Sequence, residues 1–170
     1  MVAKRIPASK GVPRRQTLRS LSPVVDPIEQ AALRYLARRD RTEAQMRAYL
    51  VRLGASSTHV RSVIKRCLEQ GYLNDERYAL RWANERLARR PMGRARLEAE
   101  LIGQGLDRDT TERALEHVYG GRNERELALA LLRQRREARN PANRLREATL
   151  LRRYGFAEES IEAVLGSGAS

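Results

Sequence analysis

The chain has 170 residues, of which 34 are Lys or Arg and 21 are Asp or Glu, so its formal net charge is +13. A charge of this size favours polyanionic partners, nucleic acid or a nucleoprotein above all. No apolar run approaches the roughly 18 residues that a membrane helix requires, and the single cysteine, Cys67, excludes an intramolecular disulfide and a cysteine-based zinc site. We therefore expect a cytoplasmic protein without a metal or other cofactor.

Residues 1–27 form the first segment, which we predict to be a basic, flexible arm. The first 25 residues hold six basic side chains and no acid. Prolines interrupt the segment, which argues against the amphipathic helix of an organelle transit peptide. The arm's arginines are candidate DNA contacts that would add salt-sensitive affinity: Arg14, Arg15 and Arg19.

The rest of the chain carries an internal repeat. Three helical segments end at Gly54, Gly105 and Gly155, at intervals of 51 and 50 residues, and a leucine precedes each glycine by four positions. A set of matching positions that recurs three times indicates tandem structural units. Glycine suits the left-handed residue that ends a helix, so each glycine is predicted to start a tight turn into a further helix.

The first repeat, residues 28–74, is predicted to contain helices over 28–39, 42–54 and 56–68. Thr42 is the expected N-cap of its second helix. The apolar stripe of that helix is Met46, Tyr49, Leu50 and Leu53. Cys67 lies on the buried side of the third helix and is interpreted as a core residue.

The second repeat, residues 75–121, is predicted to contain helices over 75–89, 93–105 and 107–118. Asn74 is the expected N-cap of the first, and Asp75 favours the positive end of that helix. Tyr78 and Trp82, one turn apart, are expected to anchor it in the core. Leu97, Leu101 and Ile102 form the apolar stripe of the second helix.

The third repeat, residues 122–166, is predicted to contain helices over 123–136, 143–155 and 157–165, followed by a tail over 167–170. Asn143 is the expected cap of its second helix, whose looser stripe comprises Leu145, Leu150 and Leu151. No segment alternates as a strand does. The fold class is therefore all-α: an elongated array of three tandem three-helix, helix-turn-helix-like repeats, because units of this size must stack to bury enough surface.

The sequence offers little for catalysis. His59 and His117 occupy non-equivalent positions of their repeats, and neither lies in a metal-ligand spacing. No phosphate-binding glycine motif follows a strand. We expect a non-enzymatic protein with no catalytic, cofactor or metal site.

Two basic surfaces are candidates for binding. The third helix of the first repeat carries Arg61, Lys65 and Arg66, which are compatible with DNA contact, whereas the third helices of the other repeats are mainly acidic. The middle of the chain gathers basic residues on neighbouring helices, and we expect them to form a contact surface rather than a merely solvated face: Arg86, Arg89, Arg90, Arg94 and Arg96.

Several linked blocks resemble the RecX family of proteins that regulate the RecA recombinase. They are G-Y-L-N-D-E-R-Y-A (71–79), R-R-P-M-G-R-A-R-L-E-A-E-L (89–101) and Y-G-F-A-E-E-S-I-E-A-V-L (154–165), with an opening block over 32–50. The match covers about residues 28–166. The family often has proline after the glycine equivalent to Gly93, whereas this chain has Arg94 there and Pro91 before it.

The resemblance implies a protein that binds the RecA–single-stranded DNA filament, touches the DNA weakly or indirectly, and lowers RecA's ATPase, strand-exchange and co-protease activities in the SOS response. We expect it to be a monomer. Two other interpretations stay open. The chain is alternatively a tandem helix-turn-helix transcription regulator, or a helical adaptor whose basic surface only aids solubility. Binding to bare duplex, bare single strand and RecA-coated single strand separates the three.

Overall fold

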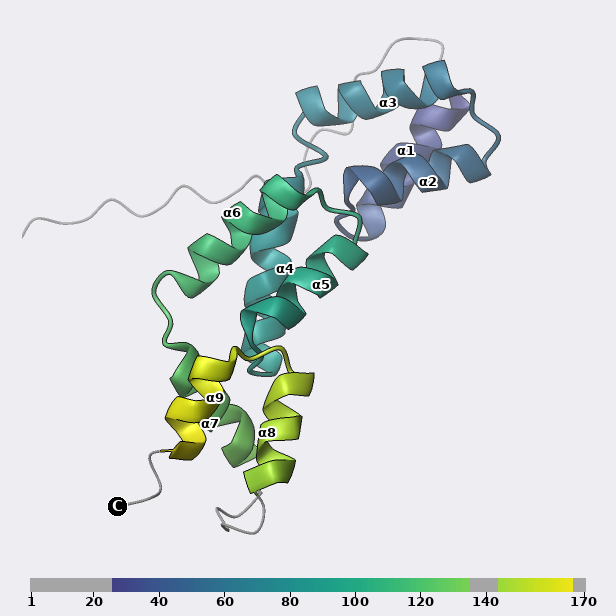
Figure 1. The fold of residues 1–170 in the computed structure, drawn as a ribbon. Coiled ribbons are helices and arrows are strands. Elements are labelled where there is room, and N and C mark those ends of the chain that lie inside the picture. The colour runs from purple at the N-terminus through teal and green to yellow at the C-terminus, as the bar shows by residue number, and fades with distance from the viewer. Residues whose placement is uncertain (1–25, 135–143, 167–170) are drawn as a thin grey trace, which may run out of the picture.

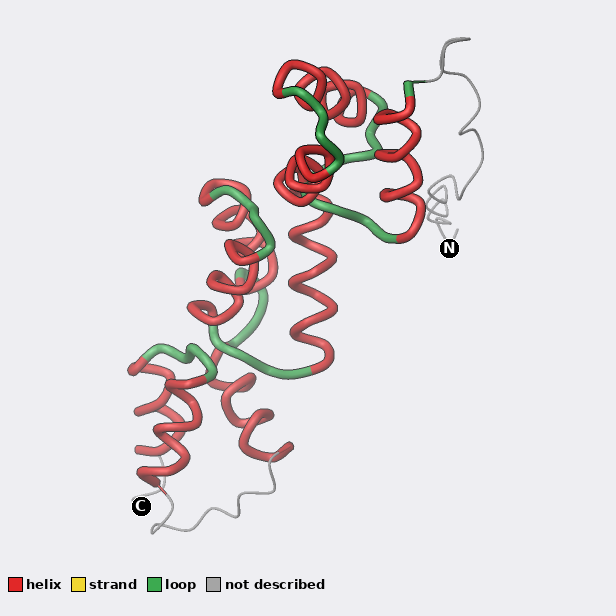
Figure 2. Tube along the Cα trace, turned by 90° about the vertical axis from the view of Figure 1, so that its right-hand side faces the viewer, coloured by secondary structure: helices red, strands yellow, loops and turns green. Residues whose placement is uncertain are grey.

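The computed structural model describes residues 26–134 and 144–166. Within this part the chain forms nine helices and no strand, which confirms the all-α prediction (Figure 2). The arm residues Arg14, Arg15 and Arg19, and Asn143, lie outside the described residues. The helices are α1 (Pro27–Arg38), α2 (Glu43–Arg52), α3 (Ser57–Glu69), α4 (Asp75–Arg89), α5 (Arg94–Gly103), α6 (Arg108–Tyr119), α7 (Glu124–Gln134), α8 (Arg144–Arg153) and α9 (Glu158–Leu165).

The helices pack in three consecutive groups of three. Contacts join α1, α2 and α3, then α4, α5 and α6, while α9 packs on both α7 and α8. The groups follow one another along an elongated molecule, with α1–α3 at one end and α7–α9 at the other (Figure 1). The three-helix groups of the sequence analysis are therefore present, and they leave most side chains near a surface.

Local capping sets where the helices begin. The Thr42 side chain accepts the Gln45 N–H at 3.1 Å, and the Asn74 side chain accepts the Arg77 N–H at 2.7 Å. Both caps were predicted, and each satisfies a donor that the first turn leaves unpaired. Gly93 occupies the position of Thr42 in the second group, at the start of α5, and provides no side-chain capping bond.

The three repeat glycines end their helices as predicted. Gly54, Gly105 and Gly155 have φ values of 81°, 86° and 77°, which other residues adopt only with strain. The residue after each glycine donates its N–H to the carbonyl of the leucine that lies four positions before the glycine, for example Ala55 to Leu50 at 3.2 Å. That leucine is fully buried in all three groups. The leucine and the glycine thus close each helix together.

The apolar packing divides the molecule unequally. One core lies within α1–α3 and its connection to α4, and includes Met46, Leu50 and Cys67. A second core runs continuously through α4–α9, from Tyr78 to Val164. The first group therefore has a core of its own, whereas the second and third groups share one.

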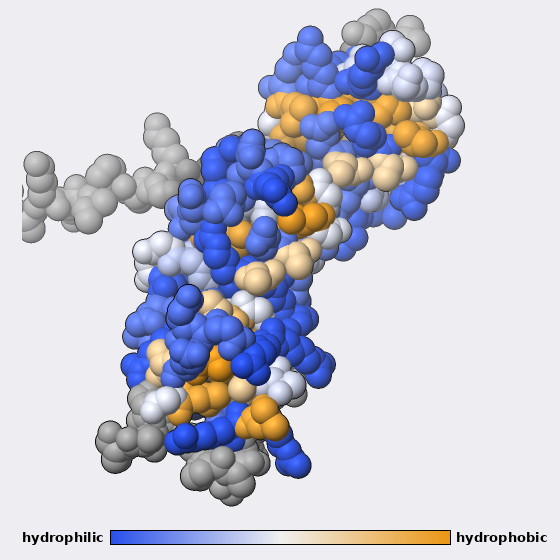
Figure 3. Space-filling model, in the orientation of Figure 1, coloured by the Kyte–Doolittle hydropathy of each residue, from blue (hydrophilic) through white to orange (hydrophobic). Residues whose placement is uncertain are grey.

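Three residues that were predicted to lie in buried apolar stripes are exposed, so the prediction is wrong for them. Leu53, Ile102 and Leu145 are 45%, 45% and 77% exposed, because the helices next to them cover only one side of α2, α5 and α8. Trp82 is half-buried and lies against the core from outside, with its ring stacked on Tyr78 at 6.0 Å, instead of filling the core. The surface in Figure 3 is accordingly hydrophilic with separate apolar patches.

Polar contacts join the first group to the second. The Thr42 hydroxyl donates to the Gln104 carbonyl at 2.9 Å, and the Gln45 side-chain amide donates to the Gln104 side-chain oxygen at 3.1 Å. Asp75, at the start of α4, accepts the Glu43 N–H at the start of α2, at 2.9 Å. The beginning of the second helix therefore docks on the glycine turn of the next group.

The second and third groups meet in the same manner. The Gly93 N–H donates to the Tyr154 carbonyl at 2.9 Å, and the Arg94 N–H donates to Glu124 at the start of α7, at 3.2 Å. Glu124 thus repeats the role of Asp75. The backbone of Gly93 lies directly against that of Gly155, so close that a Cβ at either position would overlap backbone atoms of the other group.

Candidate functional site

A cavity lined almost entirely by arginine lies where α4 ends and α5 begins. Its volume is about 290 Å³, and it is lined by Arg86, Arg89, Arg90, Met92 and Arg96. Arg86 and Arg89 occupy the last turn of α4, where cations favour the negative end of the helix dipole. Arg90 is extended and Pro91 follows it, so the chain turns here and brings Arg96 of α5 back to the same place.

Glu100 fixes two of these arginines. Arg86 donates Nε and Nη2 to the two Glu100 oxygens at 2.6 and 2.7 Å, and Arg96 Nε lies 3.4 Å from Oε1. The hydrogen bonds from Arg86 hold the pKa of Glu100 below its ordinary value, and burial opposes this shift. The carboxylate therefore stays ionised and keeps both guanidinium groups in place.

Tyr154, from the glycine turn of the third group, supports the other side of the site. Its hydroxyl accepts a hydrogen bond from Arg90 Nη1 at 2.8 Å, and the Arg96 guanidinium carbon lies 4.9 Å from the ring centroid. Arg96 also donates to the Arg153 carbonyl at 3.1 Å. The cavity is thus built across the joint between two groups, and it depends on their correct docking.

The cavity carries excess positive charge. Four guanidinium groups meet one carboxylate, Glu100. The Arg89 side chain is exposed and makes no hydrogen bond or ion pair with any of the described residues. Arginine forks match the geometry of carboxylates and phosphates. This arrangement can bind an anion, and nothing in it supplies a nucleophile or a general base.

The structure brings together four of the five predicted contact residues. Arg94 points elsewhere: its guanidinium forms an ion pair with Glu112 of α6. Sequence reasoning did not include Met92, Glu100 or Tyr154 in the site. Tyr154 is 64 residues from Arg90, and only the docking of two groups places them in contact.

The predicted DNA-contact residues of α3 are unequally available. Arg61 and Lys65 are exposed, and Lys65 has only a distant partner, Glu69, at 3.8 Å. Arg66 instead pairs with the buried carboxylate of Glu29 at 3.2 Å. Its charge is used within the first group, so Arg61 and Lys65 are the better candidates.

The described ranges hold neither a metal-binding cluster nor a membrane-spanning helix. No group of three or more His, Cys, Asp or Glu side chains there could hold a metal ion. No helix among residues 26–134 and 144–166 is long and apolar enough to cross a membrane.

Comparison with known proteins shows to which family this array of helices belongs. Profiles described as the first and second three-helix domains of RecX match residues 30–67 and 74–115. The "Regulatory protein RecX" of Syntrophotalea carbinolica is 32% identical over 133 residues, which are 75% of this chain and 86% of that protein. The chain belongs to the RecX family. This membership agrees with a regulatory, non-enzymatic protein built from tandem helical domains.

Two further comparisons support the assignment. The "Regulatory protein RecX" of Caldanaerobacter subterraneus is 28% identical over 134 residues, or 79% of this chain and 66% of that protein. The crystal structure of RecX from Lactobacillus salivarius superposes with a TM-score of 0.73 at 21% identity and covers 82% of this chain and 93% of that one. At this identity the superposition establishes the RecX fold.

Proposed function

We propose that this RecX-family protein binds the RecA–single-stranded DNA filament and modulates it, mainly by inhibiting RecA's ATPase, strand-exchange and co-protease activities. The observation that carries the proposal is the arginine cavity, which offers uncompensated positive charge on an elongated array. An array of this shape can lie along a filament and touch several subunits, so modest contacts add together.

The cavity residues are the proposed filament contact. Arg89, and Arg90, which is held by the neutral Tyr154 hydroxyl and not by a carboxylate, are the groups proposed to meet an anion. The fixed pair Arg86 and Arg96 would hold the cavity open, because Glu100 and Tyr154 already orient them. Arg61 and Lys65, together with the arm residues Arg14, Arg15 and Arg19, are proposed to touch DNA. Those contacts would be salt-sensitive, since they neutralise phosphates.

The experiment measures affinity for RecA-coated single strand, bare single strand and bare duplex. The variant Arg89→Glu/Arg90→Glu should bind the coated strand at least about tenfold more weakly and lose inhibition of RecA ATPase. Arg38→Glu/Arg39→Glu is the matched control, because it reverses the equivalent exposed pair at the end of α1. Equal behaviour of the two variants would refute the assignment of the cavity.

The same measurement tests the other interpretations. A transcription regulator would bind bare duplex with sequence preference, and an adaptor would bind none of the three. The acidic side chains on α6 and α9 argue against major-groove entry by those helices: Asp109, Glu112, Glu116, Glu158, Glu159 and Glu162. Deleting residues 1–25 should reduce the salt dependence of binding, and an unchanged slope would remove the arm from the DNA contact.

A further inference from the structure

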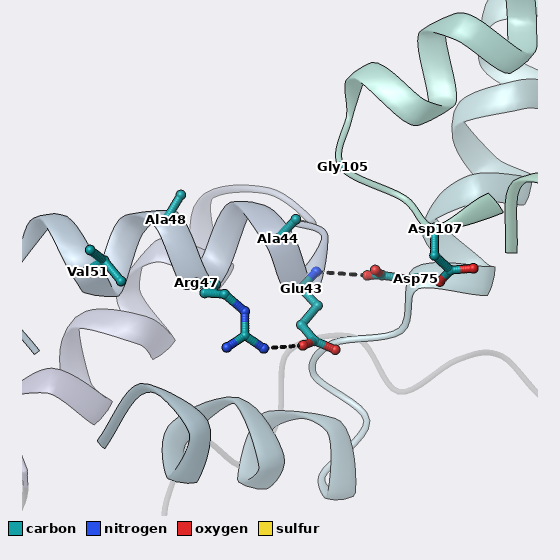
Figure 4. A pocket seen from close by; sticks show the side chains of 8 residues that line it. All are labelled: Glu43, Ala44, Arg47, Ala48, Val51, Asp75, Gly105 and Asp107. Carbon is teal, nitrogen blue, oxygen red and sulfur yellow. Dashed lines mark hydrogen bonds and ion pairs between the residues drawn. The ribbon is translucent and has the colours of Figure 1, made fainter. Parts of the chain in front are cut away.

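A second hollow lies at the joint between the first and second groups, and its charge is opposite to that of the arginine cavity. It is an open groove of about 440 Å³ where α2 meets the start of α4 and the turn between α5 and α6 (Figure 4). Its lining comprises Glu43, Ala44, Arg47, Ala48, Val51, Asp75, Gly105 and Asp107.

One wall of the groove is apolar and accessible. Ala44, Ala48 and Val51 are spaced by four and three positions, so they lie along one side of α2. Figure 4 shows Ala44 and Ala48 projecting from that side. Val51 is 57% exposed, whereas its neighbour Leu50 is fully buried. The helix therefore presents an aliphatic strip that neither core uses.

Carboxylates lie at the Ala44 end of this strip (Figure 4). Asp75 and Asp107 come from the second group and Glu43 from the first, and the only cation in the lining, Arg47, pairs with Glu43 at 2.6 Å. Burial raises the pKa of Asp75, the hydrogen bond from the Glu43 N–H opposes this shift, and the charges of Glu43 and Asp107 add to it. Three carboxylates and one guanidinium leave the lining with a formal charge of −2 in a chain whose total is +13. Such a groove repels DNA and attracts a further cation.

We infer that this groove binds a lysine or arginine side chain presented by a protein partner. The aliphatic stem of that side chain would lie on Ala48 and Val51, and its charged end would meet Asp75 and Asp107. Long basic side chains combine these two properties, which an apolar strip beside carboxylates requires. If the partner is the RecA coat, as in the proposed function, this joint contacts protein and not DNA.

Two variants test the groove while keeping the backbone hydrogen bonds that cap α2 and α6. Val51→Lys fills the strip with a competing cation at an exposed helical position. Asp75→Asn/Asp107→Ser removes two charges, but Asn still accepts the Glu43 N–H and Ser still caps α6, whose present cap Asp107 accepts the Thr110 N–H at 2.8 Å. Ile102→Lys is the matched control, because Ile102 occupies the position of Val51 in the next group and is 45% exposed.

On RecA-coated single strand, both groove variants should bind about tenfold more weakly than the wild type, and Ile102→Lys should bind like the wild type. On bare single strand, Asp75→Asn/Asp107→Ser should bind as well as the wild type or better, since lost acids reduce repulsion of phosphates. The inference is overturned if neutralising the acids strengthens binding to the coated strand, or if Val51→Lys and Ile102→Lys behave alike.

A second measurement needs no RecA. Amide NMR shifts of the full chain are followed during titration with butylguanidinium chloride, which has a cation on an aliphatic stem, and with guanidinium chloride as the control. The butyl compound should shift Glu43, Val51 and Gly105 most, and Asp75→Asn/Asp107→Ser should abolish this pattern. Uniform shifts would overturn the groove as a cation site, whereas failure of the wild type to bind coated strands would refute only the proposed function.

Discussion

Replacing Gly93 by alanine should loosen the joint between the second and third groups. The new Cβ would lie 2.0 Å from the Gly155 carbonyl oxygen, 2.3 Å from its carbon and 2.4 Å from the Phe156 nitrogen. All three are backbone atoms that cannot rotate away, so the groups must separate. Overpacking of this kind costs about 1–3 kcal/mol, and two stretched hydrogen bonds, from Gly93 to Tyr154 and from Arg94 to Glu124, add about 1 kcal/mol each. We expect a total loss of about 3–5 kcal/mol.

Urea unfolding followed by tryptophan fluorescence measures this loss, because the single tryptophan, Trp82, lies against the core shared by α4–α9. Gly103→Ala is the matched control. Its Cβ would meet nothing within 4 Å, and alanine in a helix is more stable than glycine by up to about 1 kcal/mol. If Gly93→Ala has the midpoint and slope of the wild type, the close backbone contact does not hold the groups together.

Three further substitutions test the joints and the cavity. Thr42→Ala should lower the unfolding free energy by about 1–2 kcal/mol, because it removes both the cap of α2 and the bond to Gln104. Thr42→Ser should restore most of that free energy, and equal urea midpoints for the alanine variant and the wild type would contradict the prediction. Glu100→Gln should flatten the acid dependence of stability. The pKa of Glu100 is lower in the folded state than its unfolded value of about 4.3, so the stability it contributes is present above that value and is lost as pH falls through the folded-state pKa. Parallel curves of urea midpoint against pH for the variant and the wild type would refute the pairing of Glu100 with Arg86. Tyr119→Phe should cost about 1 kcal/mol, since the partly buried hydroxyl donates to the Met92 carbonyl at 3.0 Å, and an unchanged midpoint would show that this bond adds nothing.

The helices could be predicted from the sequence because their signals are local. Thr42 and Asn74 cap through residues three positions away, and Gly54 determines its turn through its own backbone. Burial could not be predicted as well, because it depends on the neighbouring group. Leu53 and Tyr154 both precede a repeat glycine, yet Tyr154 is buried under Arg90 and Arg96, while Leu53 has no such cover among the described residues and is 45% exposed.

The candidate site shows the same division. The cluster of arginines was visible as close sequence spacing at the end of one helix and the start of the next. Which of them would share a cavity was not, because Arg94 and Arg96 lie on one helix and turn to different partners. Glu112 of α6 forms an ion pair with Arg94, whereas Glu100 and Tyr154 contact Arg96. Those choices follow from how α5 is rotated against its neighbours, which only three-dimensional packing fixes.

The turn at Leu53 and Gly54 is open within the described part of the chain, and this has an evolutionary consequence. It has the same left-handed geometry as the two turns on which a preceding group docks, and a Cβ at Gly54 would meet open space where Gly105 and Gly155 meet their neighbours. If a tandem gene duplication inserted another three-helix unit ahead of Pro27, the turn on which that unit would dock would already be formed. Lengthening of such arrays from the N-terminal side therefore requires little redesign of the existing units.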